Sequence, residues 1–185
     1  MIRVREPDLE EDAIWSLVLE LNRIVEDRAL LVCNYNGRVE RESTFQGGIH
    51  LQESLNKRQV SIVLKQKSRV VGRSIHTREM ALRANKDPLD YLTFGTIFPS
   101  LSHPDGSTQG VKALSEIVDC SIHPIIAIGG INQYNIANVM STKVYGISVI
   151  GAISESDDPV DSARQLSEIA NLNFLEGTKD RKCES

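Results

Sequence analysis

The sequence is poor in cysteine and has no long apolar stretch, and both absences limit the class of protein it can encode. Its 185 residues contain only 3 cysteines, Cys33, Cys120 and Cys183, which lie far apart. Their odd number and wide spacing match neither a disulfide framework nor a metal motif, so we expect free thiols in a reducing, cytoplasmic setting. No apolar run approaches the roughly 18 residues of a membrane span. The charged N-terminal segment does not form a signal peptide either.

An excess of basic charge is also missing. The formal net charge is −4 and no long basic run is present, which argues against a nucleic-acid groove. The chain is 41% hydrophobic and 25% charged, a composition that can build the core of a globular domain. We expect a single domain over residues 1–176 and a charged tail at 177–185.

Two short apolar segments that stop at glycine are the most informative local feature. Residues 124–131 read PIIAIGGI and residues 145–153 read YGISVIGAI. Continuous β-branched runs are typical of parallel strands that helices cover on both faces. Glycine then allows a tight turn and a close approach of backbone N–H groups to a ligand. Two such strand ends, each followed by a helix, predict a phosphate site at the last two strands of a (β/α) barrel.

Strand and helix patterns alternate along the whole chain, which predicts an α/β fold with a parallel sheet wrapped by helices. A TIM-type barrel needs eight strands and the sequence shows seven. The exposed edge strands of such a sheet can pair with another chain, so a homo-oligomer is one expectation. The predicted strands are residues 2–5, 29–33, 47–51, 70–74, 91–95, 125–128 and 146–150.

Helix starts are marked by four signals. Asp8 and Glu11 have the spacing of a capping box. Thr77 and Asn132 precede helical patterns as capping residues. Pro159 is placed to start the last helix.

Six segments match, in order, motifs that occur together in one family. The chain resembles the thiamine phosphate synthase/TenI family of (β/α)8 barrels through these segments. The first corresponds to the second strand of that family, so the family's first strand and helix have no counterpart here. The segments are IRVRE at 2–6, GIHL at 48–51, GRSIHT at 72–77, YLTFGTIFPS at 91–100, AIGGI at 127–131 and GISVIGAI at 146–153.

The resemblance implies a transferase of thiamine biosynthesis. Such an enzyme joins hydroxymethylpyrimidine diphosphate to thiazole phosphate, releases pyrophosphate and uses Mg²⁺. Its partners would be these small phosphorylated substrates, not nucleic acid or a membrane.

The resemblance also assigns site residues. Arg5, Ser74 and His103 would have catalytic roles in drawing off the pyrophosphate. The substrate-binding residues would be Arg3, Glu6, Asn34, Ser100, Ser102, Gly129, Gly130, Ile150 and Gly151.

Several polar positions depart from the family's pattern. Pro7 and His103 stand where the family has lysines. In one register Tyr35 stands where a metal aspartate is expected; another register aligns residues 36–39, NGRV, with the NGRVD of TenI-like members. The second metal aspartate falls at position 54 or 55, which leaves Glu53 as the nearest carboxylate for Mg²⁺.

Three functions are therefore weighed: a synthase, a TenI-like protein that binds or isomerises thiazole phosphate, and a catalytically degenerate barrel that binds or regulates. Thr96 occupies the place of the histidine that the family's tautomerases use, and threonine is a poor general base. His50 and His76 are expected to be hydrogen-bonded structural residues, and Trp15 a core residue.

Overall fold

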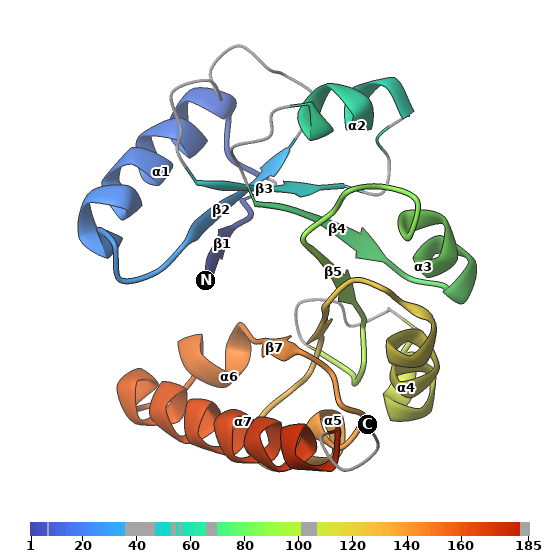
Figure 1. Cartoon of the computed structure of the whole chain (residues 1–185). Coiled ribbons are helices and arrows are strands. Elements are labelled where there is room, and N and C mark those ends of the chain that lie inside the picture. Colours follow the sequence, from blue (N-terminus) through green and yellow to red (C-terminus); the bar gives the residue numbers. More distant parts are fainter. Residues whose placement is uncertain are drawn as a thin grey trace. The chain divides into compact units, whose positions relative to one another are not determined.

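The computed structural model describes residues 1–6, 8–35, 47–52, 55, 57–65, 70–100 and 107–181 (Figure 1). The predictions made for Pro7, Glu53, Ser102 and His103 lie outside the described residues. The described chain forms two compact units, one of residues 1–74 with 88–90 and one of residues 75–87 with 91–185.

The first unit is a layer of parallel strands with two helices. Its strands follow one another in the order of the chain, and each pairs in parallel with the next. Val4 lies opposite Cys33, and Asn34 lies opposite His50. The elements are β1 (Ile2–Val4), α1 (Glu11–Val25), β2 (Leu31–Tyr35), β3 (Gly48–Leu51), α2 (Lys57–Leu64) and β4 (Val71–Ile75), of which Ile75 counts to the second unit.

Helix α1 covers one face of β1 and β2. Its fully buried Val18 packs with Val4, Leu31 and Cys33 of the strands. Partly buried residues of the same helix face, Trp15 among them, complete this cluster, as expected for Trp15. Side chains alternate between the two faces of a strand, so Arg3, Val32 and Asn34 lie on the face opposite α1.

The second unit contains the remaining strands, paired in parallel as β5-β6-β7, with helices between them. Its elements are α3 (Arg78–Ala84), β5 (Tyr91–Phe94), α4 (Gly110–Cys120), β6 (Ile125–Ile128), α5 (Ile136–Met140), β7 (Gly146–Ser148), α6 (Gly151–Ser154) and α7 (Pro159–Arg181).

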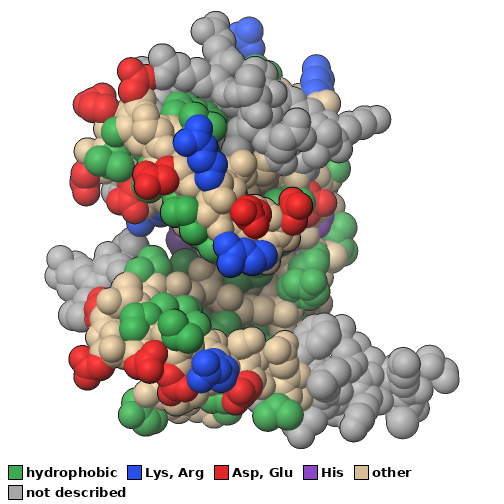
Figure 2. Space-filling model, turned by 90° about the vertical axis from the view of Figure 1, so that its left-hand side faces the viewer, with side chains coloured by type: hydrophobic (Ala, Val, Ile, Leu, Met, Phe, Trp, Pro, Cys, Tyr) green, Lys and Arg blue, Asp and Glu red, His purple; other side chains and the backbone are tan. Residues whose placement is uncertain are grey.

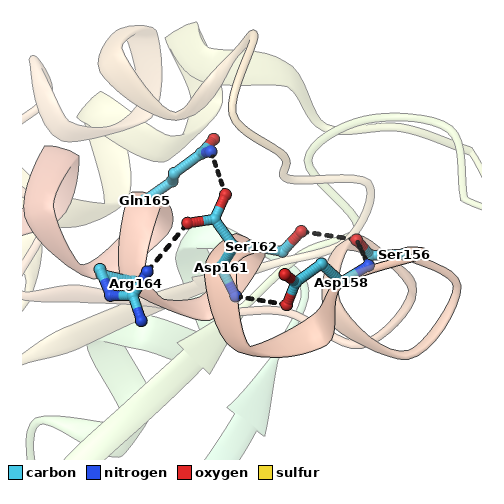
Figure 3. A network of polar contacts seen from close by, with 6 residues as sticks. All are labelled: Ser156, Asp158, Asp161, Ser162, Arg164 and Gln165. Atoms are coloured by element: carbon cyan, nitrogen blue, oxygen red, sulfur yellow. Dashed lines mark hydrogen bonds and ion pairs between the residues drawn. The ribbon is translucent and has the colours of Figure 1, made fainter.

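A polar network fastens the first turn of α7 (Figure 3). Asp158 Oδ1 accepts a hydrogen bond from Asp161 N at 2.9 Å, which satisfies one of the unpaired N–H groups of the helix start. Asp161 in turn accepts from Arg164 and Gln165 along the helix surface. Pro159 opens this helix, as the sequence predicts, because its fixed φ suits the first helical position.

All seven predicted strands are present, each with its ends within two residues of the predicted ones. Thr77 caps α3 as predicted, since its Oγ1 accepts from Met80 N at 3.2 Å. The Asp8–Glu11 capping box is wrong, because the N-cap of α1 is Glu10 and makes no side-chain cap bond. Asn132 is not the cap of α5 either; that position belongs to Asn135.

The structure also bears on the expectations for the cysteines and for membrane-spanning helices. Cys33 and Cys120 are thiols that form no disulfide, whereas Cys183 lies outside the described residues. Among the described residues no helix combines the length and apolar character that crossing a membrane requires.

Val18 and Leu19 provide a matched test of the cluster under α1. Val18 is fully buried and Leu19 is 59% exposed on the same helix. Val18→Ala should lower the free energy of unfolding by about 2 kcal/mol, because buried methyl groups leave a cavity. Leu19→Ala should change it by less than about 0.5 kcal/mol. Urea denaturation measures both, and equal effects would contradict this packing.

Candidate functional site

Four polar side chains, one from each strand of the first unit, lie in a row on the face opposite α1. We call Arg3, Asn34, His50 and Ser74 the polar row. Asn34 pairs with His50, and His50 pairs with Gly72, two residues before Ser74 on the same face. The row therefore runs across β1, β2, β3 and β4, near the carboxyl ends where (β/α) barrels place their active sites.

Hydrogen bonds link the members of the row in two pairs. Arg3 Nε donates to Asn34 Oδ1 at 2.9 Å. His50 Nε2 and Ser74 Oγ lie 2.8 Å apart and share a hydrogen bond. His50 is completely buried. The sequence-based expectation of a hydrogen-bonded His50 is thus confirmed, and the structure adds that its partner is a predicted site residue.

Burial determines the charge of His50. It lowers the pKa of His50 from 6.5 to about 3, and the positive charge of Arg3 contributes to the same effect. The imidazole is therefore neutral near pH 7, with one nitrogen as donor and the other as acceptor. Arg3 is the only charged member of the polar row.

Arg5 and Glu6 are exposed residues that directly follow β1. Arg5 lies two residues after Arg3, so the chain places two cations at the carboxyl end of this strand. His76, at the start of the second unit, shares a hydrogen bond of 2.8 Å between its Nδ1 and the carbonyl oxygen of Gly95. His76 thus has the structural type of contact that the sequence predicts.

The two glycine-ended strands lie side by side in the second unit. β6 pairs with β7, and Ile128 lies opposite Ser148. Beyond Ile128 the chain turns at Gly129 and Gly130, with φ of +105° and +62°. These values lie in the region that glycine occupies at little cost. Beyond β7, Ile150 is 58% exposed and precedes α6.

We call Gly129, Gly130, Ile150 and Gly151 the glycine cradle. A Cβ built on Gly129 would overlap Thr96, and one built on Gly130 would overlap the carbonyl oxygens of Phe98 and Pro99.

Hydrogen bonds hold the turn of the cradle from both sides. Phe98 N donates to Gly129 O at 3.1 Å. Asn135 Nδ2 donates to Gly130 O at 2.9 Å. Ser100 follows directly after the Phe98–Pro99 segment and is half-buried. Close packing alone thus accounts for glycine at 129 and 130, and phosphate binding there stays a prediction.

Gly151 has a different environment. A Cβ at Gly151 would lie 2.9 Å from Glu155 Oε1, the end of a flexible side chain. Figure 2 shows that acidic side chains gather on this face over α6 and the start of α7, and Glu155, Asp157 and Asp158 are exposed there. An anion at Gly151 would therefore meet a carboxylate unless Glu155 turns away.

The donor set of the described residues does not fit a Mg²⁺ site. Among them, no group of three or more His, Cys, Asp or Glu side chains could hold a metal. The amide oxygen of Asn34 accepts from the Arg3 guanidinium, and a cation so close disfavours a second one. Glu53 lies outside the described residues.

Sequence reasoning missed two positions that shape the site. His50 orders Ser74, and Asn135 holds Gly130. The sequence could have indicated Asn135, because it is a second asparagine three residues after Asn132 and before the same helix. Asn132 N donates to Asn135 Oδ1, and Asn132 Oδ1 accepts from Tyr134 N, so both asparagines serve the same loop.

Parallel strands alternating with helices, with polar residues and glycine turns at the strand ends, define a protein of the (β/α)-barrel class. A solved structure has this fold: thiamine phosphate pyrophosphorylase from Pyrococcus furiosus, with a TM-score of 0.81 and 26% identity over 93% of this chain and 83% of that one. The predicted fold class, a TIM-type barrel, is thereby confirmed.

Sequence comparison gives the particular family. The pattern of the family described as thiamine monophosphate synthase matches residues 1–153. A thiamine-phosphate synthase of Clostridium botulinum (strain Hall) is 31% identical over 160 residues, which cover 85% of this chain and 78% of that protein. One of Clostridium tetani is 29% identical over 173 residues, covering 92% and 82%. The chain belongs to the thiamine monophosphate synthase family, and its function is thiamine phosphate synthase-like.

The buried His50 predicts a pH-dependent stability. Between pH 6.5 and 3 the unfolded chain binds a proton at His50 that the folded chain does not, so stability falls as pH falls. From pH 7 to pH 5 this residue should cost the wild type about 2 kcal/mol. Urea denaturation at both pH values measures the change. In His50→Gln this part of the loss should vanish; the same loss in both proteins would show that His50 is not the cause.

Gly129 and Gly146 provide a matched test of the cradle. Gly129→Ala should destabilise the fold by at least about 2 kcal/mol, through a left-handed φ and the overlap with Thr96. Gly146 begins β7, and a Cβ added there would meet no atom within 4 Å. Gly146→Ala should therefore stay within about 0.5 kcal/mol of the wild type. Thermal and urea unfolding compare the two, and a tolerated Gly129→Ala would refute the close packing.

Proposed function

We propose that this chain is an enzyme that condenses hydroxymethylpyrimidine diphosphate with thiazole phosphate and releases pyrophosphate. The observation that carries the proposal is the side-by-side pair of strand ends at β6 and β7, with a left-handed glycine turn on β6, in a chain of this family. In the reaction the bond between the pyrimidine methylene carbon and the diphosphate oxygen breaks, and a bond from that carbon to the thiazole nitrogen forms.

The glycine cradle would hold the thiazole phosphate. Backbone N–H groups at Gly129, Gly130 and Gly151 can bind phosphate oxygens without any side chain. Glycine at 129 and 130 keeps the turn in a conformation that other residues adopt only with strain. Ile150 would border the ligand, since its side chain is exposed. Ser100 and Ser102 would add hydroxyl donors.

The residues of the first unit would bind the other substrate. Ser74 offers a hydroxyl whose place is held by His50. Arg5 offers an exposed cation after β1 that would contact the leaving pyrophosphate. Arg3, Glu6 and Asn34 would contact the substrate at the carboxyl end of β1 and β2. We derive no step through Mg²⁺, because the described donors do not fit it.

A thiazole tautomerase finds no comparable support. Its proton-transfer position is Thr96, whose methyl carbon lies 2.4 Å from the place that a Cβ on residue 129 would take. That contact gives Thr96 a packing role next to the turn. The thiols of Cys33 and Cys120 support the further proposal of a cytoplasmic location.

The activity is tested with purified protein, both phosphorylated substrates and Mg²⁺, by measuring released pyrophosphate. Pyrophosphate should appear in proportion to thiamine phosphate. Thiazole phosphate should also raise the melting temperature. If thiazole phosphate stabilises the protein but no pyrophosphate appears at high enzyme concentration, the chain is a binding protein and the proposed reaction is wrong.

Gly151→Asp tests the cradle separately. The added carboxylate should repel the phosphate and weaken thiazole phosphate binding at least tenfold, on the order of 1.4 kcal/mol. Asn138→Asp adds the same charge at an exposed position of α5 and should leave affinity within twofold. Titration calorimetry measures both. An unchanged affinity in Gly151→Asp would remove Gly151 from the site.

A further inference from the structure

We propose that His76 is a positioning residue for thiazole phosphate binding: its imidazole holds the backbone of residues 95–99, and this segment holds the turn of the glycine cradle. The inference rests on the proposed function, because that function places the thiazole phosphate at the cradle. It goes beyond the proposed function by assigning a role to a side chain outside the cradle and the polar row.

The contact of His76 with Gly95 connects the start of α3 to the end of β5. His76 directly precedes Thr77, the cap of α3, and Gly95 directly follows β5. His76 Nδ1 lies 2.8 Å from Gly95 O. A carbonyl oxygen can only accept, so Nδ1 carries a hydrogen and donates it. Because the side chain of His76 is exposed, its role is not that of a core residue.

Gly95 is the first residue of the segment that borders the cradle turn. A Cβ built on Gly95 would lie 2.1 Å from Ile128 O, at the end of β6. Ile97 N donates to the same oxygen at 3.0 Å, and Phe98 N donates to Gly129 O at 3.1 Å. The segment thus follows the chain from β6 into the turn, and a displacement of Gly95 would disturb both hydrogen bonds.

Backbone groups at the start of α4 hold the same segment from another side. Gln109 N donates to Thr96 O at 2.8 Å, and Gly110 N donates to Ile97 O at 3.1 Å. At Gly95, by contrast, the donor belongs to a side chain. A single substitution of His76 can therefore remove this contact without changing the backbone of the segment.

Loss of the His76 contact should affect binding more than folding. A backbone segment with one restraint fewer has more conformations to lose when a ligand orders it, and this cost weakens binding. An exposed side chain, in turn, contributes little to the stability of the fold. The affinity for thiazole phosphate should therefore fall while the protein stays folded.

His123 provides a matched control in the same unit. Its Nε2 lies 3.1 Å from Ala84 O, so it also makes an imidazole–carbonyl contact. His123 precedes the amino end of β6, whereas the cradle turn follows the carboxyl end of that strand. A substitution there removes the same kind of hydrogen bond at the opposite end of β6.

The first test is titration calorimetry with thiazole phosphate. His76→Leu should bind about fivefold more weakly than the wild type, in line with the loss of one hydrogen bond. In His76→Asn the side-chain amide can donate in place of Nδ1, so affinity should stay within about twofold. His123→Leu should also stay within about twofold. Both leucine variants should lower the melting temperature alike, by about 2–4 °C. Equal losses of affinity in the two leucine variants, or no rescue by asparagine, would overturn the role of His76.

The second test is amide hydrogen exchange in the ligand-free protein, which needs no reaction. In His76→Leu the amides of Ile97 and Phe98 should exchange several-fold faster, because their hydrogen bonds open more often. The amide of Tyr145 donates to Ile125 O at the other end of β6 and should keep its wild-type rate. His76→Asn should exchange like the wild type at all three amides. Unchanged rates at Ile97 and Phe98 in His76→Leu would contradict the positioning.

These results separate the role of His76 from the proposed reaction. A protein that binds thiazole phosphate in a His76-dependent way but makes no thiamine phosphate keeps the positioning role and loses the reaction. An active enzyme in which His76→Leu changes neither affinity nor exchange keeps the reaction and loses the positioning role. A wild type that does not bind thiazole phosphate overturns both.

Discussion

The packing of α1 on β1 and β2 decides the chemistry of the first unit. Val4, Leu31 and Cys33 meet Val18 of the helix, so one face of these strands is committed to an apolar core. Side chains alternate along a strand, and the opposite face must then receive Arg3 and Asn34. A shift of one residue in the register would bury the guanidinium under α1 and expose the core. The polar row is thus a consequence of where the apolar residues pack.

The second unit depends on a different constraint, the turn after β6. Gly129 and Gly130 combine left-handed φ values with backbone contacts that leave no room for a Cβ. Phe98 N and Asn135 Nδ2 hold the two carbonyl groups of this turn. Left-handed φ values, close contacts and held carbonyl groups together leave this turn few alternative conformations. Gly151 lacks this support and faces Glu155, so the two halves of the cradle differ in how well they suit an anion.

The charged side chains of this chain differ from those that the family pattern has at the same positions. Lysines and a metal aspartate are replaced at positions 7, 103 and 35, whereas a guanidinium stands in the polar row. The burial of His50 keeps that residue neutral, so it adds no charge beside Arg3.

Apolar periodicity and glycine placement are enough to predict the element types, the fold class and the two glycine-ended strands, because both reflect local backbone physics. Strand ends were placed to within two residues, and Thr77 and Pro159 marked helix starts correctly. The folded structure was needed to show that Asn135, not Asn132, holds the N-cap position of α5, and that His50 is hydrogen-bonded to Ser74. Those choices depend on which groups meet across neighbouring strands and loops. A sequence pattern contains the candidates, but burial, partner and charge arise when residues such as Arg3 and Asn34, far apart in the chain, become neighbours in the sheet.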